Sequence, residues 1–509
     1  MDLRTKIGMR LFSGFPGKEM SEEFRRMVRE YKLGNVILFS NNIESLEQLN
    51  RLCVEIDEFI TAETGYHPLI SIDQEGGMVS RLPDNTVVAP SQMAESALAD
   101  PDLIEECAYR NGRLLMELGC NFNLAPVLDV NMSLKNPVIG VRSFSDKTEK
   151  VAEYGARAVK GYNRSGILSS AKHFPGHGNT GTDSHLSLPV IDLERDELSE
   201  QLKPFVRAME EGVPAVTTSH ILFPKIEPDV PCTMSRRLIT GLLREELGFK
   251  GIVISDCMQM QAISRFYGSV NGAVRAFEAG VDMVFFSHDV TLVESFVNEY
   301  ERLMNEGGID IENFDACVSR VLAVKEKLSP VTISSDTAFE ETKKFFDETA
   351  EAAVTEVIPL PENFDPKKAI FIGPEAYITS KISDRIERTA FPSFMAKEFF
   401  TKAVITTADP SEAQIESVCG EADGYEYAVV GTYNAHLQKG QEALIRALSE
   451  DHKVILFALR NPYDMREENL SHVKGAFATY EYSERIFREC ARILKGEGKL
   501  RGKLPVYVG

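Results

Sequence analysis

Short apolar runs alternate with helical stretches along the first two thirds of the chain. Eight such runs lie between residues 7 and 287, and each has the length of a buried strand. Strands that alternate with helices pair in parallel, so eight such units predict a (β/α)8 TIM-like barrel over residues 1–330, closed by a helix at Asn313 to Leu328. The runs are Ile7 to Phe12, Val36 to Phe39, Leu69 to Ile72, Asn121 to Leu128, Ile167 to His173, Ala215 to Ser219, Gly251 to Ser255 and Val281 to Phe286.

A second, smaller domain is predicted after the barrel. Residues 331–361 are interpreted as a linker followed by a charged bridging helix, at Phe339 to Val357. Apolar runs then alternate with helices again, which predicts a three-layer α/β sandwich over residues 362–509. The runs of this domain are Ala369 to Ile372, Ala403 to Thr406, Tyr427 to Gly431, Val454 to Leu459 and Gly475 to Ala478.

Polar side chains follow nearly every predicted barrel strand. Structural polar residues scattered at random would not share one end of the strands, whereas active sites of such barrels lie at the carboxyl ends. The pattern therefore predicts an enzyme. The residues are Ser40 and Asn41, Asp73 to Gly77, Asp129, Lys172 and His173, Ser219 and His220, Asp256, and Ser287 and His288.

The segment from Lys172 to His185 contains three histidines, a lysine and an aspartate around Pro175 and three glycines. Proline and glycine exclude a regular helix or an interior strand, so the polar groups lie on a loop. Asp183 and His185 face one side of an extended backbone, where the carboxylate orients the imidazole and raises its pKa for general acid and base catalysis. An isolated pair of this kind more often caps a turn, but the surrounding sequence favours the dyad.

Asp256 ends the apolar run Val253 to Ser255, where its carboxylate is held rigidly and faces the barrel mouth. An ionised carboxylate there is placed to attack a sugar anomeric carbon and form a glycosyl ester. Asp at a strand-to-helix junction also serves as an N-cap, and this residue alone does not decide between the two.

Other strand ends supply groups that hydrogen-bond sugar hydroxyls. Asp73 is an acceptor, and Lys172, His173, Arg142 and Arg81 are donors. Either arginine could instead pair with carboxylates at the barrel rim. Together these residues predict a sugar-binding pocket.

The composition of the chain limits the kinds of molecule that it can bind. The formal net charge is −21 and the pI is near 5.0, which disfavours nucleic acid and anionic lipid as partners. No apolar run approaches the ~20 residues that span a bilayer, and the N-terminus lacks the layout of a secretion signal. Eight scattered cysteines without a C-x-x-C pair indicate reduced thiols. We expect a soluble, cytoplasmic protein.

Four motifs together resemble those of glycoside hydrolase family 3, in its β-N-acetylglucosaminidase branch. They are Asp73-Gln-Glu-Gly-Gly-x-Val-x-Arg81-Leu, Asn136-Pro-Val-Ile-Gly-x-Arg142-Ser-Phe, Lys172-His-Phe-Pro-Gly-His-Gly-x-Thr-x-x-Asp183-Ser-His185 and Ser255-Asp256-x-Met-x-Met260. The closing Ala478-Thr-Tyr-Glu-Tyr-Ser and Gly502-Lys-Leu-Pro-Val also look like that family's second domain.

The resemblance implies a retaining, exo-acting enzyme that needs no cofactor and no metal. It implies Asp256 as nucleophile, His185 as acid and base, and Asp183 as its partner. It also implies a substrate with a terminal β-N-acetylglucosamine. The implied sugar-binding residues are Asp73, Arg81, Arg142, Lys172, His173 and Met260.

Three positions depart from the family pattern, namely Met78, Asn179 and Cys257. Because of these departures, the resemblance does not define the subsite that binds the leaving group. A neutral imidazole does not repel an anionic acceptor as a carboxylate would. This predicts that inorganic phosphate competes with water, so that the enzyme is partly a phosphorylase.

Other functions fit the sequence less well. A zinc hydrolase would use His173, His177, Asp183 and His185, but Pro175 interrupts helical ligand spacing. A mechanism through the substrate's own acetamide needs a second acid beside Asp256. A broader β-glycosidase and a non-catalytic sugar-binding protein are further alternatives.

The second domain has no assigned chemistry in the sequence. Its polar loop from Gly431 to His436, with Gln438, either lines the leaving-group subsite or faces solvent. The sequence also does not decide whether the natural leaving group comes from a muropeptide, from chitobiose or from a glycoprotein fragment. The sequence does not indicate the oligomeric state.

Overall fold

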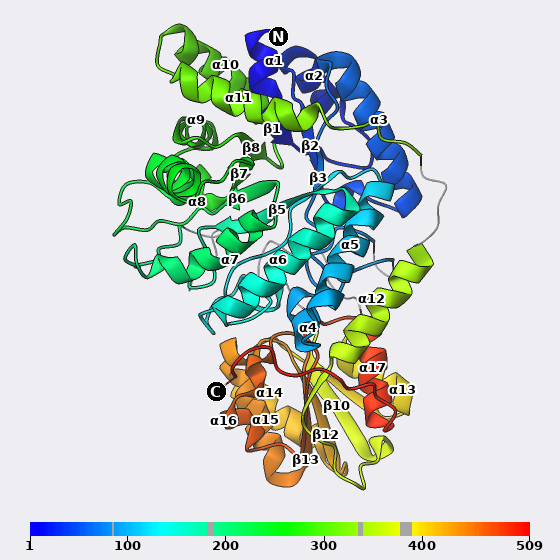
Figure 1. Cartoon of the computed structure of the whole chain (residues 1–509). Coiled ribbons are helices and arrows are strands. Elements are labelled where there is room, and N and C mark those ends of the chain that lie inside the picture. The colour runs from blue at the N-terminus through cyan, green and yellow to red at the C-terminus, as the bar shows by residue number, and fades with distance from the viewer. Residues whose placement is uncertain (84–85, 181–187, 334–338, 377–388, 509) are drawn as a thin grey trace.

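The computed structural model describes residues 1–83, 86–180, 188–333, 339–376 and 389–508. Eight parallel strands close into a barrel, in which β1 pairs with β8 as well as with β2. The predicted TIM-like barrel is therefore confirmed (Figure 1). Its strands are β1 (Leu11–Ser13), β2 (Asn35–Leu38), β3 (Ile70–Ile72), β4 (Phe122–Asn123), β5 (Leu168–Phe174), β6 (Ala215–Thr218), β7 (Ile252–Cys257) and β8 (Met283–Phe286).

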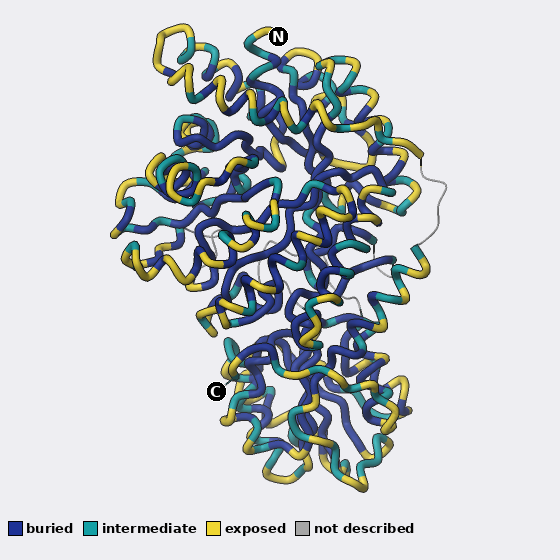
Figure 2. The backbone as a smooth tube through the Cα atoms, viewed as in Figure 1, coloured by how far each residue is buried: buried dark blue, intermediate teal, exposed yellow. Residues whose placement is uncertain are grey.

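Helices surround the barrel and bury their apolar faces against the strands (Figure 2). Typical end chemistry bounds them: in α3, Ser45 accepts a hydrogen bond from the N–H of Gln48, and Gly65 ends the helix at a φ of 81°. The helices are α1 (Leu3–Gly8), α2 (Glu22–Tyr31), α3 (Leu46–Thr64), α4 (Gln92–Ala97), α5 (Pro101–Glu117), α6 (Thr148–Ser165), α7 (Leu198–Glu210), η4 (Arg237–Glu246), α8 (Gln261–Ser264), α9 (Ser269–Ala279), α10 (Thr291–Asn305) and α11 (Ile311–Lys325).

Two predicted barrel strands differ from the observed ones. The chain does not enter β1 directly, because Asp2 caps the short helix α1 and the predicted run Ile7 to Phe12 covers the end of α1 and the start of β1. The predicted run Asn121 to Leu128 contains only two strand residues, and Pro126 within it has no N–H to donate to a neighbouring strand.

The second domain is a six-stranded sheet in the order β11-β10-β12-β13-β14-β9, with helices on both faces. The predicted three-layer sandwich is confirmed. The predicted bridging helix is too long: α12 ends at Ala353, and residues 355–358 form β9, which pairs antiparallel with β14. The elements are α12 (Phe339–Ala353), β9 (Thr355–Ile358), β10 (Ala369–Pro374), α13 (Phe391–Phe399), β11 (Lys402–Thr406), α14 (Glu412–Ala422), β12 (Tyr427–Thr432), α15 (Lys439–Asp451), β13 (Lys453–Ala458), α16 (Glu467–Leu470), β14 (Gly475–Ala478) and α17 (Glu484–Leu494).

The two domains share a hydrophobic core. Met93 and Ala97 of α4, and Val141 of the loop after β4, belong to one buried cluster with Tyr463 and Tyr480 of the second domain. The barrel loops that follow β3 and β4 are therefore packed against the second domain. No helix in the described parts of the chain is long and apolar enough to cross a membrane.

Candidate active site

A cavity of about 350 Å³ opens at the carboxyl ends of the barrel strands. The predicted residues Asp73, Arg81, Arg142, Lys172, His173, Asp256 and Met260 all line it. The structure thus brings together side chains from the ends of β3, β5 and β7 and from the loop after β4. The remaining lining residues are Ile37, Phe39, Leu124, Thr217, Ser255, Cys257, Gln259, Gln261, Phe285, Ser287 and His288.

Asp256 occupies the end of β7, as its apolar run predicts. Its Oδ1 accepts a hydrogen bond from the backbone N–H of Cys257 at 2.7 Å. The carbonyl of Cys257 in turn lies 3.0 Å from Nε2 of His220. The carboxylate is therefore held against the strand end and presented to the cavity.

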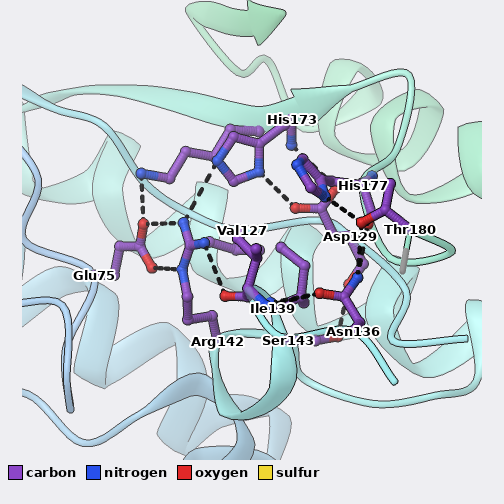
Figure 3. A network of polar contacts seen from close by, with 12 residues as sticks. Glu75, Val127, Asp129, Asn136, Ile139, Arg142, Ser143, His173, His177 and Thr180 are labelled. Carbon is purple, nitrogen blue, oxygen red and sulfur yellow. Dashed lines mark hydrogen bonds and ion pairs between the residues drawn. The ribbon is translucent and has the colours of Figure 1, made fainter. Parts of the chain in front are cut away.

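Lys172, Arg142 and Glu75 form a buried charged network beside the cavity. Figure 3 shows the pairing of Arg142 with Glu75. The Lys172 Nζ lies 2.8 Å from Asp73 Oδ1 and 2.5 Å from Glu75 Oε1. Arg142 donates two hydrogen bonds to Glu75, at 2.7 and 2.8 Å. Both cations are almost fully buried, so their pairing fixes them before any ligand arrives.

The network keeps these groups ionised. Burial alone would raise the pKa of Glu75, but Arg142 and Lys172 outweigh it and hold that pKa far below its usual value. Burial likewise opposes the charge on Lys172, and Asp73 and Glu75 overcome it and raise the lysine pKa. Asp73, the most exposed member, completes the site with Arg81, whose Nη2 lies 3.5 Å from it.

Asp129, which is fully buried, orients His173. Its Oδ2 lies 2.6 Å from His173 Nδ1, and its Oδ1 accepts a hydrogen bond from the N–H of His177 at 2.6 Å (Figure 3). His173 Nε2 then faces Arg142 Nη2 at 3.5 Å. Burial and the neighbouring His173 lower the pKa of His177 to about 4, so His177 is neutral at pH 7.

The chain beyond His177 is anchored as far as Thr180. Asn136 donates to the carbonyl of His177, and Thr180 Oγ1 lies 3.0 Å from His177 Nδ1. Gly178 is needed there, because a Cβ atom at that position would come within 1.6 Å of the carbonyl oxygen of Val130. The predicted dyad, Asp183 and His185, lies outside the described residues.

Glu75 and Asp129 are among the polar residues predicted at the strand ends, but the sequence assigns neither a role. Strand position alone placed them at the barrel mouth. Their pairing with Arg142 and His173 comes from the fold. Arg142 does pair with a carboxylate, but Glu75 is buried rather than at the rim, and Arg142 also lines the cavity.

A larger hollow, of about 960 Å³, lies on the outer wall between α6 and α7. Charged side chains along it pair with one another, as in Arg195 with Glu246 and Lys203 with Glu149. It lies away from the strand ends and contains no histidine. We therefore assign the site to the smaller cavity.

The described residues contain no group of three or more His, Cys, Asp or Glu side chains that could hold a metal ion. Of the ligands in the zinc alternative, His173 Nδ1 is bonded to Asp129 and His177 Nδ1 to Thr180. The other two, Asp183 and His185, lie in the undescribed segment.

The second-domain loop after β12 does not line the cavity. The side chain of His436 is 2% exposed, so the loop does not present it to solvent either. Its Nδ1 lies 2.8 Å from Oδ1 of Asp464. The His436 side chain therefore does not face solvent, and the alternative in which this loop lines the leaving-group subsite stays a prediction.

The sequence profile described as the N-terminal domain of glycosyl hydrolase family 3 matches residues 3–324, which span the whole barrel. The chain belongs to glycosyl hydrolase family 3. It is a glycoside hydrolase, and the cavity at the barrel mouth is the candidate active site of a family 3 enzyme.

Two similar proteins match this chain over both domains, and a third matches it over two thirds of its length. A family 3 β-N-acetylglucosaminidase from Paenibacillus sp. str. FPU-7 superposes with a TM-score of 0.90 at 36% identity, covering 100% of this chain and 99% of that one. Beta-hexosaminidase A of Pseudoalteromonas piscicida is 28% identical over 96% of this chain and 91% of its own length. NagZ from Neisseria gonorrhoeae covers 67% of this chain and 97% of its own, at 27% identity and a TM-score of 0.57.

Proposed function

We propose that this enzyme is a retaining, exo-acting β-N-acetylglucosaminidase that releases terminal N-acetylglucosamine. One observation carries the proposal: the carboxylate of Asp256 lines the same small cavity as Asp73, Lys172 and Arg142. Double displacement needs a nucleophile beside the bound sugar and a group that acts as acid and base, and this cavity brings the nucleophile together with preorganised sugar ligands. The β-N-acetylglucosaminidase from Paenibacillus supports the choice of sugar.

In the first step the ionised Asp256 carboxylate attacks the anomeric carbon. The glycosidic C–O bond breaks, a covalent glycosyl ester forms, and the departing oxygen takes a proton. We assign that proton to His185, oriented by Asp183, on the strength of the sequence motif. In the second step the same imidazole takes a proton from water, which attacks the anomeric carbon. The bond to Asp256 breaks, the carboxylate is restored, and the sugar leaves with retained configuration.

The sugar ring is held by groups that are already paired. Asp73 accepts hydrogen bonds from hydroxyls, and Lys172 and Arg142 donate to sugar oxygens without leaving Glu75. Because Glu75 and Asp129 already fix these donors and His173, little reorganisation accompanies binding. Arg81 and Met260 complete the wall of the cavity.

Initial rates with aryl β-glycosides of N-acetylglucosamine, N-acetylgalactosamine and glucose test the proposal. We expect the N-acetylglucosaminide to be hydrolysed fastest. The variant Asp256→Asn keeps the side-chain volume and removes the charge, so it should lose about 10³-fold or more of kcat. A preference for the glucoside, or an active Asp256→Asn enzyme, would overturn the proposal.

A further inference from the structure

The loop after β4 carries two groups that shape the sugar cavity. Asp129 at its start holds His173, and Arg142 near its end pairs with Glu75. The two ends of the loop are bonded to each other: Ser143 Oγ donates to the carbonyl of Asp129, and the N–H of Asn131 donates to the carbonyl of Ser145. Asn131 therefore lies at the neck of this loop.

The second domain contacts the same loop at several points. Val141 is buried in the core of the second domain, while its neighbour Arg142 lines the sugar cavity. Asn461 lies so close to Gly140 that a Cβ atom there would come within 2.4 Å of the Asn461 Oδ1. The position of Arg142 thus depends on a surface that the second domain supplies.

Two hydrogen bonds join the neck of the loop to the second domain. Ser145 Oγ donates to the carbonyl of Pro505 at 2.6 Å, and the other bond links two buried side chains. The Asn131 Nδ2 donates to the hydroxyl oxygen of Tyr463, a second-domain residue that is 1% exposed. Asn131 is also buried, so removal of the Tyr463 hydroxyl would leave its amide N–H without that acceptor.

Tyr463 is itself held in place by a histidine and a carboxylate. The ring of His436 packs edge-on against the Tyr463 ring, with centroids 5.4 Å apart. Asp464, the next residue, accepts hydrogen bonds from the N–H of His436 and from Thr432 Oγ1, and it lies within hydrogen-bond distance of the His436 imidazole. This arrangement gives the hydroxyl a defined position at the domain boundary.

We propose that Tyr463 is a positioning residue for sugar binding, acting through Asn131 on the loop that carries Asp129 and Arg142. The inference rests on the proposed function, because it treats Arg142 and His173 as sugar ligands. It gives the second domain a role in the reaction without placing any of its residues in the cavity.

Kinetics and binding of Tyr463→Phe test the proposal, with Tyr480→Phe as the matched control. Tyr480 is equally buried in the second domain, but its hydroxyl bonds to Thr355 and not to the barrel. For Tyr463→Phe we expect KM for an aryl β-N-acetylglucosaminide and Kd for free N-acetylglucosamine to rise about tenfold. Tyr480→Phe should lose comparable thermal stability and keep both constants.

A double-mutant cycle tests whether Tyr463 acts on sugar binding through its hydrogen bond to Asn131. Asn131→Ala removes the same hydrogen bond from the barrel side, and it serves as the test if Tyr463→Phe does not fold. We expect the double variant to bind no more weakly than Asn131→Ala alone. Additive losses, or wild-type constants in Tyr463→Phe, would overturn this inference. An inactive wild-type enzyme would instead overturn the proposed function.

Discussion

Asp129 Oδ2 lies 2.6 Å from Nδ1 of His173, and both side chains are buried beside the sugar cavity. Burial opposes the charge of Asp129, but the facing His173 outweighs it and lowers the pKa of the carboxyl group. The carboxylate therefore fixes which edge of the imidazole faces the cavity.

Asp129→Asn tests this relationship. The amide cannot match the charge-assisted bond, so we expect kcat/KM to fall about 100-fold through loss of His173 orientation. Asp57→Asn is the matched control, because Asp57 is also buried and lies 2.7 Å from His67 Nδ1, away from the sugar cavity. Equal activity losses in the two variants would contradict a specific role for Asp129.

Glu75→Gln should weaken both sugar binding and the fold. Removing one partner of a buried ion pair costs about 3–5 kcal/mol of unfolding free energy. The pKa of Glu75 is lowered in the folded state, so its contribution is present above its unfolded pKa and is lost as the pH falls below that value. Urea unfolding at several pH values should show the gap between wild type and variant narrowing in acid; a constant gap would contradict this account.

Lys325 should make the fold more stable at alkaline pH. Burial lowers its pKa to about 7, although its Nζ donates to the carbonyls of Gly34 and His67. The unfolded chain then binds more protons between pH 7 and about 10, so stability rises with pH there by up to about 1.4 kcal/mol per unit. This rise should disappear in Lys325→Met and persist in Lys327→Met, which changes an exposed lysine of the same segment.

Phosphorolysis is a further prediction of the histidine acid and base. At saturating phosphate we expect N-acetylglucosamine 1-phosphate among the products. A neutral imidazole does not repel an anionic acceptor that approaches the glycosyl ester, as a carboxylate would. Product analysis in phosphate and in a non-nucleophilic buffer checks this. Free N-acetylglucosamine as sole product in both buffers would contradict it.

Local patterns predicted the parts of the fold that depend on nearby residues. Apolar runs predicted the barrel strands, and polar residues at the ends of these runs predicted the cavity. Both patterns depend only on residues that are close together in the sequence. The run Ile7 to Phe12 was misread because apolar residues continue from α1 into β1. Likewise, the apolar residues Ala353 and Val354 connect α12 to β9, and no polar residue separates the helix from the strand. The sequence pattern therefore does not reveal where β9 begins.

Contacts between distant segments could not be predicted. Glu75 and Arg142 are 67 residues apart, and nothing near either residue specifies the other. Val141 and Tyr463 meet only because the second domain packs onto the barrel. The pairing of His436 with Asp464 could not be predicted for the same reason, since Asp464 follows a different strand.

Covalent trapping tests the central claim most directly. A 2-acetamido-2-deoxy-5-fluoro-glycosyl fluoride should form an ester that turns over slowly, and mass spectrometry of the digested protein should find the sugar on Asp256. The account predicts a label on the peptide that contains Asp256 and none in Asp256→Asn. Turnover of this reagent without a covalent intermediate, or a label on another carboxylate, would contradict it.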